Sequence, residues 1–311
     1  MNIHPLFSPW GRFGLYSFFI DAPEPAIVDT GIASSPAAMA RELEKIGRRI
    51  EDVRWILLTH GHIDHVGGAH ALWELTGRRA RVCIHAADAP LLRSRRAHTN
   101  SIRALYVHDT NIEAREIAAA EAVISGEMEP HLLLEGGETL SLGGDITVSV
   151  HAIPGHTPGS VAYVVSAPDA GDRADGRRDV FVGDAVQIHG AANGFPGYED
   201  PVAYRASLRC LRDGIRPSRL YLGHPYRRAD GTPYGIRLDA AQAREALRES
   251  LDIEARIAAA ATRATNAVTD GTASPYSPFA DVAAELGYTG DPTLEPSPFF
   301  TTMHGYVRKA S

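Results

Sequence analysis

Three histidines and one aspartate lie within six consecutive positions of the sequence, as His60, His62, Asp64 and His65. Imidazole nitrogens and carboxylate oxygens are ligands that Zn²⁺ and other first-row divalent ions accept. Because the segment is short, its side chains are expected to point into one small volume. The spacing therefore predicts a metal site.

Three further candidate ligands follow later in the chain, each beside a glycine. His156 lies in the segment Pro-Gly-His-Thr-Pro-Gly-Ser, whose glycines and prolines restrict the direction of the imidazole. Asp184 follows Gly183, and His224 follows Gly223. A single histidine after a strand is usually structural, but three such positions and a histidine cluster together favour a shared site.

Apolar runs typical of buried strands precede most of these residues. Residues 55–58 lead to His60, residues 180–182 lead to Asp184, and residues 220–222 lead to His224. Side chains that follow neighbouring strands meet at one edge of a sheet. We therefore expect the candidate ligands to converge at such an edge.

The other elements alternate between strands and helices up to about residue 236, and the chain is helical after that. We divide it into a catalytic domain, 1–236, and a helical extension, 237–311. The predicted strands are 14–20, 26–28, 81–84, 146–150 and 161–165, and the predicted helices are 35–46, 69–75, 239–268 and two that begin near Ser277-Pro278 and Ser297-Pro298.

Composition is ordinary for a globular protein of 311 residues, and the formal net charge of −7 disfavours a nucleic-acid partner. No run approaches the roughly 20 apolar residues of a membrane span, and no signal segment opens the chain, so we expect a cytoplasmic protein without a membrane partner. Cys83 and Cys210 are interpreted as two buried thiols, with a disulfide between them as the alternative.

The motifs resemble those of the metallo-β-lactamase superfamily, in the family's order. The His-x-His-x-Asp-His segment, His156, Gly183-Asp184 and Gly223-His224 carry the resemblance, and Asp29-Thr30-Gly31 matches the turn behind the family's site. The resemblance implies an α/β fold, a four-layer αβ/βα sandwich, here with a C-terminal helical appendage.

The same resemblance implies two divalent ions, with zinc expected before iron or manganese. Three histidines would hold the first ion, one aspartate and two histidines the second, and one aspartate would bridge them. These are, in that order, His60, His62 and His156; Asp64, His65 and His224; and Asp184.

Two details narrow the resemblance. The second ligand group has Asp64 and no cysteine, which resembles glyoxalase II and lactonases more than the cysteine-containing β-lactamases, and His62 is not the glutamate of the flavodiiron branch. The sequence from His156 to Ser160 also resembles that of glyoxalase II. The C-terminal region, however, has no basic cluster suited to the carboxylates of glutathione.

We expect hydrolysis of a thioester, ester or lactone. A hydroxide bridging the two ions, formed because metal binding lowers the pKa of water toward about 7, would attack the acyl carbonyl. Asp64 and Asp184 are the predicted catalytic residues. The sequence offers no Gly-x-Ser-x-Gly nucleophile and no suitable cysteine.

Two alternatives remain beside this hypothesis: a mononuclear-iron persulfide dioxygenase, and a regulatory or partner-binding protein with vestigial activity. The expected partner is a small acyl substrate, and a homodimer is an alternative to a monomer. The residues predicted to contact substrate are His98, Tyr106, His108, Asn193, Phe195 and Tyr198.

Overall fold

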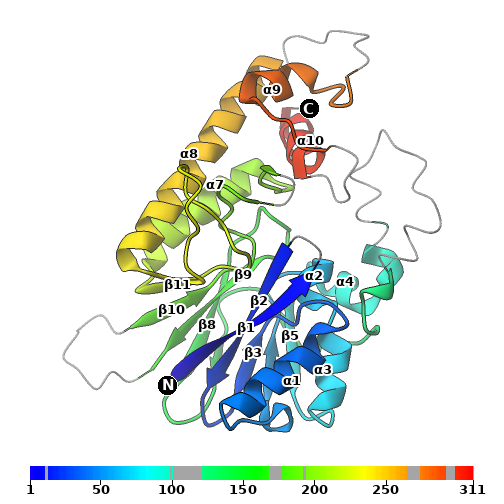
Figure 1. The fold of residues 1–311 in the computed structure, drawn as a ribbon, viewed down its shortest axis with the longest axis vertical. Coiled ribbons are helices and arrows are strands. Elements are labelled where there is room, and N and C mark those ends of the chain that lie inside the picture. Colours follow the sequence, from blue (N-terminus) through cyan, green and yellow to red (C-terminus); the bar gives the residue numbers. More distant parts are fainter. Residues whose placement is uncertain are drawn as a thin grey trace.

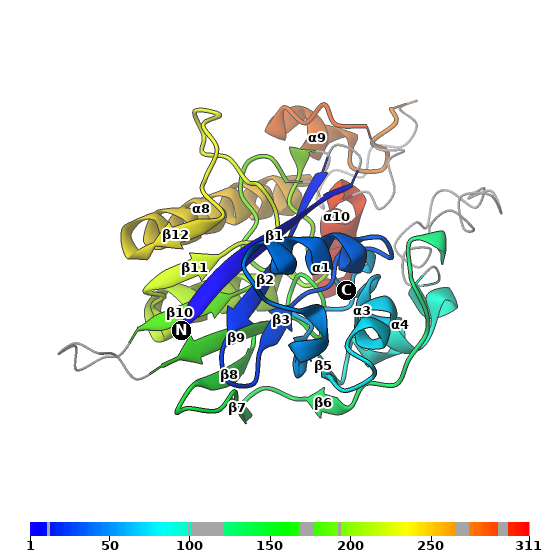
Figure 2. The same ribbon diagram turned by 60° about the horizontal axis from the view of Figure 1, so that its bottom comes forward.

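Two six-stranded sheets lie face to face, with helices on both outer faces (Figures 1 and 2). The computed structural model describes residues 1–10, 13–98, 100, 121–167, 177–191, 194–264, 274–291 and 298–310. The predicted four-layer αβ/βα sandwich with a helical C-terminal region is confirmed.

The first sheet has the strand order β1-β2-β3-β4-β5-β6. The pairs β1–β2 and β2–β3 are antiparallel, and the pairs from β3 to β6 are parallel. Its strands are β1 (Asn2–Trp10), β2 (Phe13–Asp21), β3 (Ala26–Val28), β4 (Trp55–Leu57), β5 (Arg81–His85) and β6 (Leu132–Leu134).

The second sheet has the order β12-β11-β10-β9-β8-β7, and among its pairs only β10–β11 is parallel. Its strands are β7 (Thr139–Ser141), β8 (Thr147–Ala152), β9 (Val161–Ser166), β10 (Arg178–Phe181), β11 (Arg219–Tyr221) and β12 (Arg237–Asp239).

Helices α1 and α3 pack on the first sheet, and α7 and α8 pack on the second (Figure 1). A short 3-10 helix (Ile50–Asp52) precedes β4, and a π-helix (Cys210–Ile215) continues α7. The helices are α1 (Ser35–Lys45), α2 (Ile63–Val66), α3 (Ala69–Leu75), α4 (Ala89–Arg93), α7 (Pro201–Arg209), α8 (Ala240–Ala264), α9 (Ala280–Leu286) and α10 (Pro298–Ala310).

The strands are apolar on both faces because each sheet is covered on both sides. In β4, Trp55 and Leu57 face the core between the sheets, whereas Ile56 faces the core beneath α1 and α3. In β10 and β11, Phe181 and Tyr221 stack at 4.5 Å between the sheets. Side chains of a strand alternate between faces, so a fully apolar run is what a central strand of this sandwich requires.

The C-terminal helices form a separate apolar cluster over α8. Ile257 of α8, Val282 of α9 and Phe299 of α10 are buried together in it. The predicted boundary at residue 236 falls just before β12, which still pairs with β11, so the division into two domains stays a prediction. In the described part of the chain, no helix combines the length and the apolarity needed to cross a membrane.

The fold contains one strand that the sequence did not indicate, and one expectation is wrong. Residues 2–10 were not predicted as a strand, yet they form β1; Pro5 and Pro9 are tolerated because β1 is an edge strand of its sheet. Cys210 is exposed, whereas Cys83 is buried as expected.

Candidate metal centre

The structure brings all seven predicted ligands into one cluster. Their donor atoms form three groups, and within each group the atoms lie within 4.8 Å of one another. The middle group shares a member with each of the other two, so the groups form one continuous centre. The groups are His60, His62 and His156; His60, His65 and Asp184; and Asp64, His65 and His224.

The end of β4 and the start of α2 position the His-x-His-x-Asp-His segment. The backbone of His62 is extended, and α2 begins at the next residue, so Asp64 and His65 project from the first turn of a helix. The turn at Gly183 packs directly against this segment. A Cβ atom at Gly183 would lie 2.3 Å from the Thr59 hydroxyl, and the residue has φ +50°, so only glycine fits there.

Asp29, behind the centre, fixes two of these residues through buried hydrogen bonds. Its carboxylate accepts from the Thr59 backbone N–H at 2.8 Å and from the Thr59 hydroxyl at 2.8 Å. The His65 Nδ1 donates to the same carboxylate at 2.8 Å. Asp29 has φ +57° and is 3 % exposed, a conformation that aspartate tolerates better than most residues. The turn Asp29-Thr30-Gly31 therefore holds His65 in place.

Four histidines of the centre are oriented through Nδ1, which leaves Nε2 directed into the centre. His60 Nδ1 donates to the Thr59 hydroxyl at 3.1 Å, and His65 Nδ1 to Asp29. His156 Nδ1 donates to the Gly197 carbonyl at 2.6 Å. His224 Nδ1 donates to the carbonyl of Gly14 at 2.9 Å. Such hydrogen bonds behind an imidazole are what metal-ligating histidines need in order to keep one tautomer and one direction.

Two imidazole nitrogens of the centre face each other at short range. His60 Nε2 and His156 Nε2 are 3.2 Å apart. Burial lowers the pKa of both side chains, and nearby imidazoles lower the pKa of His60 further, so both are neutral. The acceptors behind the two rings, the Thr59 hydroxyl and the Gly197 carbonyl, favour the tautomer with the proton on Nδ1, and in that tautomer both Nε2 atoms present lone pairs. A cation between them would relieve this repulsion.

The other half of the centre gathers negative charge. His224 Nε2 lies 3.3 Å from Asp64 and 3.2 Å from Asp184. Against the effect of burial, these two carboxylates raise the pKa of His224 to about 10. Facing each other at 3.5 Å, the buried His65 Nε2 and Asp184 Oδ1 have no hydrogen-bond partner among the described residues. Two carboxylates, together with a nitrogen and an oxygen that lack hydrogen-bond partners, are suited to binding a divalent cation.

Asp88 is a residue of the site that the sequence interpretation missed. Its carboxylate accepts from the Gly61 N–H at 2.7 Å, the Thr157 hydroxyl at 2.7 Å and the Gly159 N–H at 2.8 Å. It therefore joins the loop of His60 and His62 to the loop of His156. The signal in the sequence was its position shortly after β5, at the sheet edge where Asp64 follows β4.

Gln187 is the second missed residue, and it connects the Asp184 turn with Gly197. Its side-chain oxygen accepts from the Gly197 N–H at 2.7 Å, and its amide donates to the Gly197 carbonyl at 3.0 Å. The same carbonyl accepts from His156. Gln187 thus fixes the backbone that orients this histidine, and nothing local in the sequence indicates that role.

The predicted substrate contacts are dispersed. His98 is buried, with its ring 6.4 Å from the ring of His62. Phe195 lines a cavity beside α8. Tyr198 has no exposed surface and stacks on Tyr204 at 4.3 Å, so it packs inside the core. The remaining three predicted contacts lie outside the described residues: Tyr106, His108 and Asn193.

A family model described as the metallo-beta-lactamase superfamily matches residues 11–224. This range covers more than half of the chain and contains all seven residues of the centre. The chain belongs to the metallo-β-lactamase superfamily. The predicted family is thereby confirmed, and the family's residue order corresponds to one spatial cluster at the sheet edges of this chain.

Curated relatives of this superfamily member are about 30 % identical to it. A probable metallo-hydrolase of Burkholderia pseudomallei is 30 % identical over 204 residues, which are 63 % of this chain and 59 % of that protein. A hydroxyacylglutathione hydrolase of Acidiphilium cryptum is 31 % identical over 191 residues, 61 % of this chain and 56 % of that protein. The chain thus spans less than two thirds of the length of these relatives.

Among solved structures, a metallo-beta-lactamase family protein from Thermus thermophilus is similar over 99 % of this chain and 93 % of its own, with a TM-score of 0.68 and 22 % identity. A beta-lactamase from Chitinophaga pinensis covers 79 % of this chain and 89 % of its own, with a TM-score of 0.55 and 21 % identity. These likenesses support the fold. The first extends over the helical C-terminal region as well.

Proposed function

We propose that this superfamily member is a metal-dependent hydrolase that cleaves a thioester, ester or lactone with two divalent ions. Zinc is expected before iron or manganese. The observation that carries the proposal is the pair of neutral imidazoles, His60 and His156, whose Nε2 lone pairs face each other at 3.2 Å. With both rings protonated on Nδ1, a cation held between the two nitrogens would stabilise this arrangement. The relatives named metallo-hydrolases support the same reaction class.

Each residue of the centre has a proposed role. His60, His62 and His156 would hold one ion, and Asp64, His65 and His224 would hold the second. Asp184, whose donor atom groups with those of His60 and His65, would serve both ions. Bound there, divalent ions would supply a water of lowered pKa and polarise a carbonyl oxygen.

The protein's own thiols do not compete as nucleophiles. Cys83 is buried, and burial raises the pKa of its thiol to about 12, so it stays protonated. Cys210 is exposed on the π-helix after α7, outside the donor groups of the centre. With the thiols set aside, we propose that water is the attacking group and that Asp64, beside His224 at 3.3 Å, would help to orient it.

Three considerations favour an acyl substrate over a phosphodiester. The net charge of −7 does not attract polyanions. The second donor group contains a carboxylate, Asp64, and no cysteine. Relatives named hydroxyacylglutathione hydrolases act, by their name, on an acyl derivative of a thiol. We therefore expect a thioester or lactone with an apolar acyl group to be a better substrate than bis-nitrophenyl phosphate.

The decisive experiment combines elemental analysis with a substrate panel on one preparation. We expect two transition-metal ions per chain and hydrolysis of a thioester or lactone at a higher kcat/KM than bis-nitrophenyl phosphate. One ion or none after repletion contradicts the dinuclear centre. Iron with oxygen uptake on a persulfide indicates a dioxygenase, and a stable protein complex without acyl turnover indicates a regulatory protein.

A further inference from the structure

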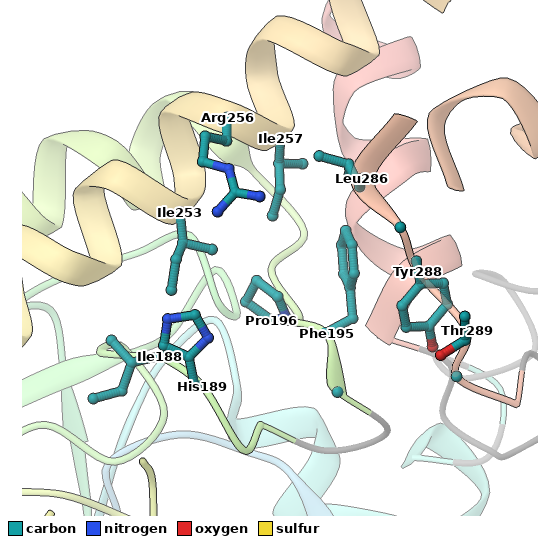
Figure 3. Close-up of a pocket in the computed structure, with 13 residues that line it drawn as sticks. Ile188, His189, Phe195, Pro196, Ile253, Arg256, Ile257, Leu286, Tyr288 and Thr289 are labelled. Atoms are coloured by element: carbon teal, nitrogen blue, oxygen red, sulfur yellow. The ribbon is translucent and has the colours of Figure 1, made fainter. Parts of the chain in front are cut away.

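Helix α10, near the C-terminal end of the chain, packs against the segment that orients His156. Phe299 of α10 meets Phe195 of this segment, with ring centroids 5.1 Å apart. In Figure 3, Phe195 and Pro196 lie on the segment beside the red ribbon of α10, and they also line the cavity beside α8. The family model ends at residue 224, so α10 lies outside the part of the chain that it matches. Its contact with the support of a metal ligand therefore needs an explanation of its own.

Residues along one face of α10 make this contact. Pro298, Thr302 and Gly305 lie at the spacing of a single helix face. A Cβ atom on Gly197 would lie 3.2 Å from the Cβ of Pro298. A Cβ atom on Gly305 would lie 2.6 Å from the backbone oxygen of Glu199. Glycine on both sides thus lets the helix and the segment approach closely.

Thr302 joins this helix face to the segment through two hydrogen bonds, and it has no exposed surface. Its hydroxyl donates to the Pro196 carbonyl at 2.8 Å. The same oxygen accepts from the Tyr198 N–H at 3.0 Å. Thr302 therefore holds the two peptide groups on either side of the Gly197 Cα atom.

One of these peptide groups is the one to which His156 donates. The Gly197 carbonyl, which accepts from His156 Nδ1 at 2.6 Å, belongs to the same peptide group as the Tyr198 N–H. A peptide group is planar, so a hydrogen bond that fixes its N–H also fixes the direction of its carbonyl. Hydrogen bonds linked in a chain also polarise one another. The Thr302 hydroxyl is thus one peptide group away from a candidate metal ligand.

Gln187 and Thr302 hold different atoms of the same two peptide groups. Gln187 accepts from the Gly197 N–H at 2.7 Å and donates to the Gly197 carbonyl at 3.0 Å. Thr302 bonds to the other two polar atoms, the Pro196 carbonyl and the Tyr198 N–H. Both side chains are therefore needed to fix the backbone behind His156.

We propose that Thr302 is a positioning residue for the first metal ion, so that α10 is part of the support of the metal centre. The inference rests on the metal binding in the proposed function and is independent of the acyl substrate. The second group of ligands is held elsewhere, since His65 donates to Asp29 and His224 donates to the Gly14 carbonyl. Loss of the Thr302 hydroxyl should therefore weaken the binding of one ion and leave the other unchanged.

Stepwise zinc binding to the full-length, metal-free protein tests the inference without any turnover, by competition with a chromophoric chelator. Thr302→Val keeps the shape of the side chain but leaves two buried backbone groups without their partner. We expect it to weaken one of the two binding steps about three- to tenfold, less than a direct partner of the ligand would. The affected step should be the one that His62→Ala removes. Thr302→Ser, which keeps the hydroxyl, should bind both ions like the unmodified protein.

Tyr306→Phe is the matched control, because it removes a second hydroxyl from α10. The partners of this hydroxyl are side chains, Glu254 at 2.9 Å and the Tyr198 hydroxyl at 3.1 Å, and not the backbone behind His156. The control should lower the temperature of thermal unfolding and leave both binding steps unchanged. If Thr302→Val does not fold, Thr302→Ala against Thr302→Ser gives the same comparison, because both lack the methyl group and only serine keeps the hydroxyl.

Three results overturn the inference while the proposed function stands. They are unchanged zinc affinity without the Thr302 hydroxyl, equal weakening of both binding steps, and an equal loss of affinity in Tyr306→Phe. A protein that binds no zinc at all overturns the proposed function and this inference together. Weakening of the one step, restored by serine and absent from the control, supports the positioning role.

Discussion

The metal centre and the neighbouring cavity are built in different ways. The candidate ligands of the centre lie shortly after strands, and hydrogen bonds behind four of the histidines fix their direction, as Asp29 does for His65 and Gly197 for His156. The cavity wall instead consists of single side chains from α8, α9 and a loop, held by apolar packing. The comparison shows that strand ends and directed hydrogen bonds position the centre, whereas side-chain packing in the helical region forms the cavity wall.

The largest effect is expected when the shared ligand of the centre loses its charge. Asp184→Asn should lower kcat/KM more than about 100-fold, since a neutral amide bridges two cations poorly and even residues behind a ligand are worth about 10- to 100-fold. Steady-state kinetics with metal content measured on the same sample checks this. Asp145→Asn, an exposed aspartate on a turn, is the control. Near-full turnover in Asp184→Asn would show that the assignment is wrong.

Asp88→Ala should have the next largest effect, although Asp88 touches no substrate. Its loss leaves the Gly61 N–H, the Gly159 N–H and the Thr157 hydroxyl without their acceptor, and each orphaned buried donor costs about 1 to 3 kcal/mol. We expect metal affinity, measured by competition with a chromophoric chelator, to fall about 10- to 100-fold. Asp88→Asn, which keeps one acceptor oxygen, should lose less. Unchanged metal affinity with reduced activity would contradict a positioning role.

His98→Ala should change kcat/KM by less than about tenfold, and by different factors for different acyl substrates. Its ring is 6.4 Å from the His62 ring, yet His98 is not part of any donor group. His62→Ala is the informative comparison, because it removes a proposed ligand and should be severe for every substrate. A loss of bound metal in His98→Ala would instead place this residue in the centre.

The smallest effect on the centre is expected from Glu254→Gln. This buried carboxylate accepts from Arg205 at 2.6 Å and from the Tyr306 hydroxyl at 2.9 Å, and so links α8 to α7 and α10. Thermal unfolding should show a loss of about 1 to 2 kcal/mol, allowing for the exposure of Arg205, while metal content stays unchanged. Glu285→Gln, in an exposed pair with Arg263, should cost less. Metal loss in Glu254→Gln would mean that the two regions are not separable.

The parts of the fold that sequence predicts are those with short-range signals. The helix 69–75 matches α3, and the apolar run 26–28 matches β3, because periodicity and turn residues are local. The four candidate ligands between His60 and His65 are close in sequence, so their convergence in space follows almost directly from the sequence. The edge strand β1 was not predicted because Pro5 and Pro9 argue against a strand. Proline is tolerated in an edge strand, but only the pairing with β2 shows that β1 lies at an edge.

The supporting residues of the site could not be predicted in the same way. Asp88 meets Thr157 across 69 positions and Gln187 meets Gly197 across 10, and no spacing rule marks either pair. Tyr198 illustrates the opposite error, because an aromatic residue in a loop after a ligand looks available and is fully buried. A side chain's environment depends on contacts that only the assembled sandwich provides.

The hydrogen bond between His224 and Gly14 spans 210 positions, and it has a consequence for biosynthesis. During translation, the three-histidine group is complete once residue 156 has left the ribosome. The group of Asp64, His65 and His224 has to wait for residue 224 and for its docking on the first hairpin. The donor atoms of the two groups therefore leave the ribosome at different nascent-chain lengths, the three histidines before β10 and β11 are synthesised.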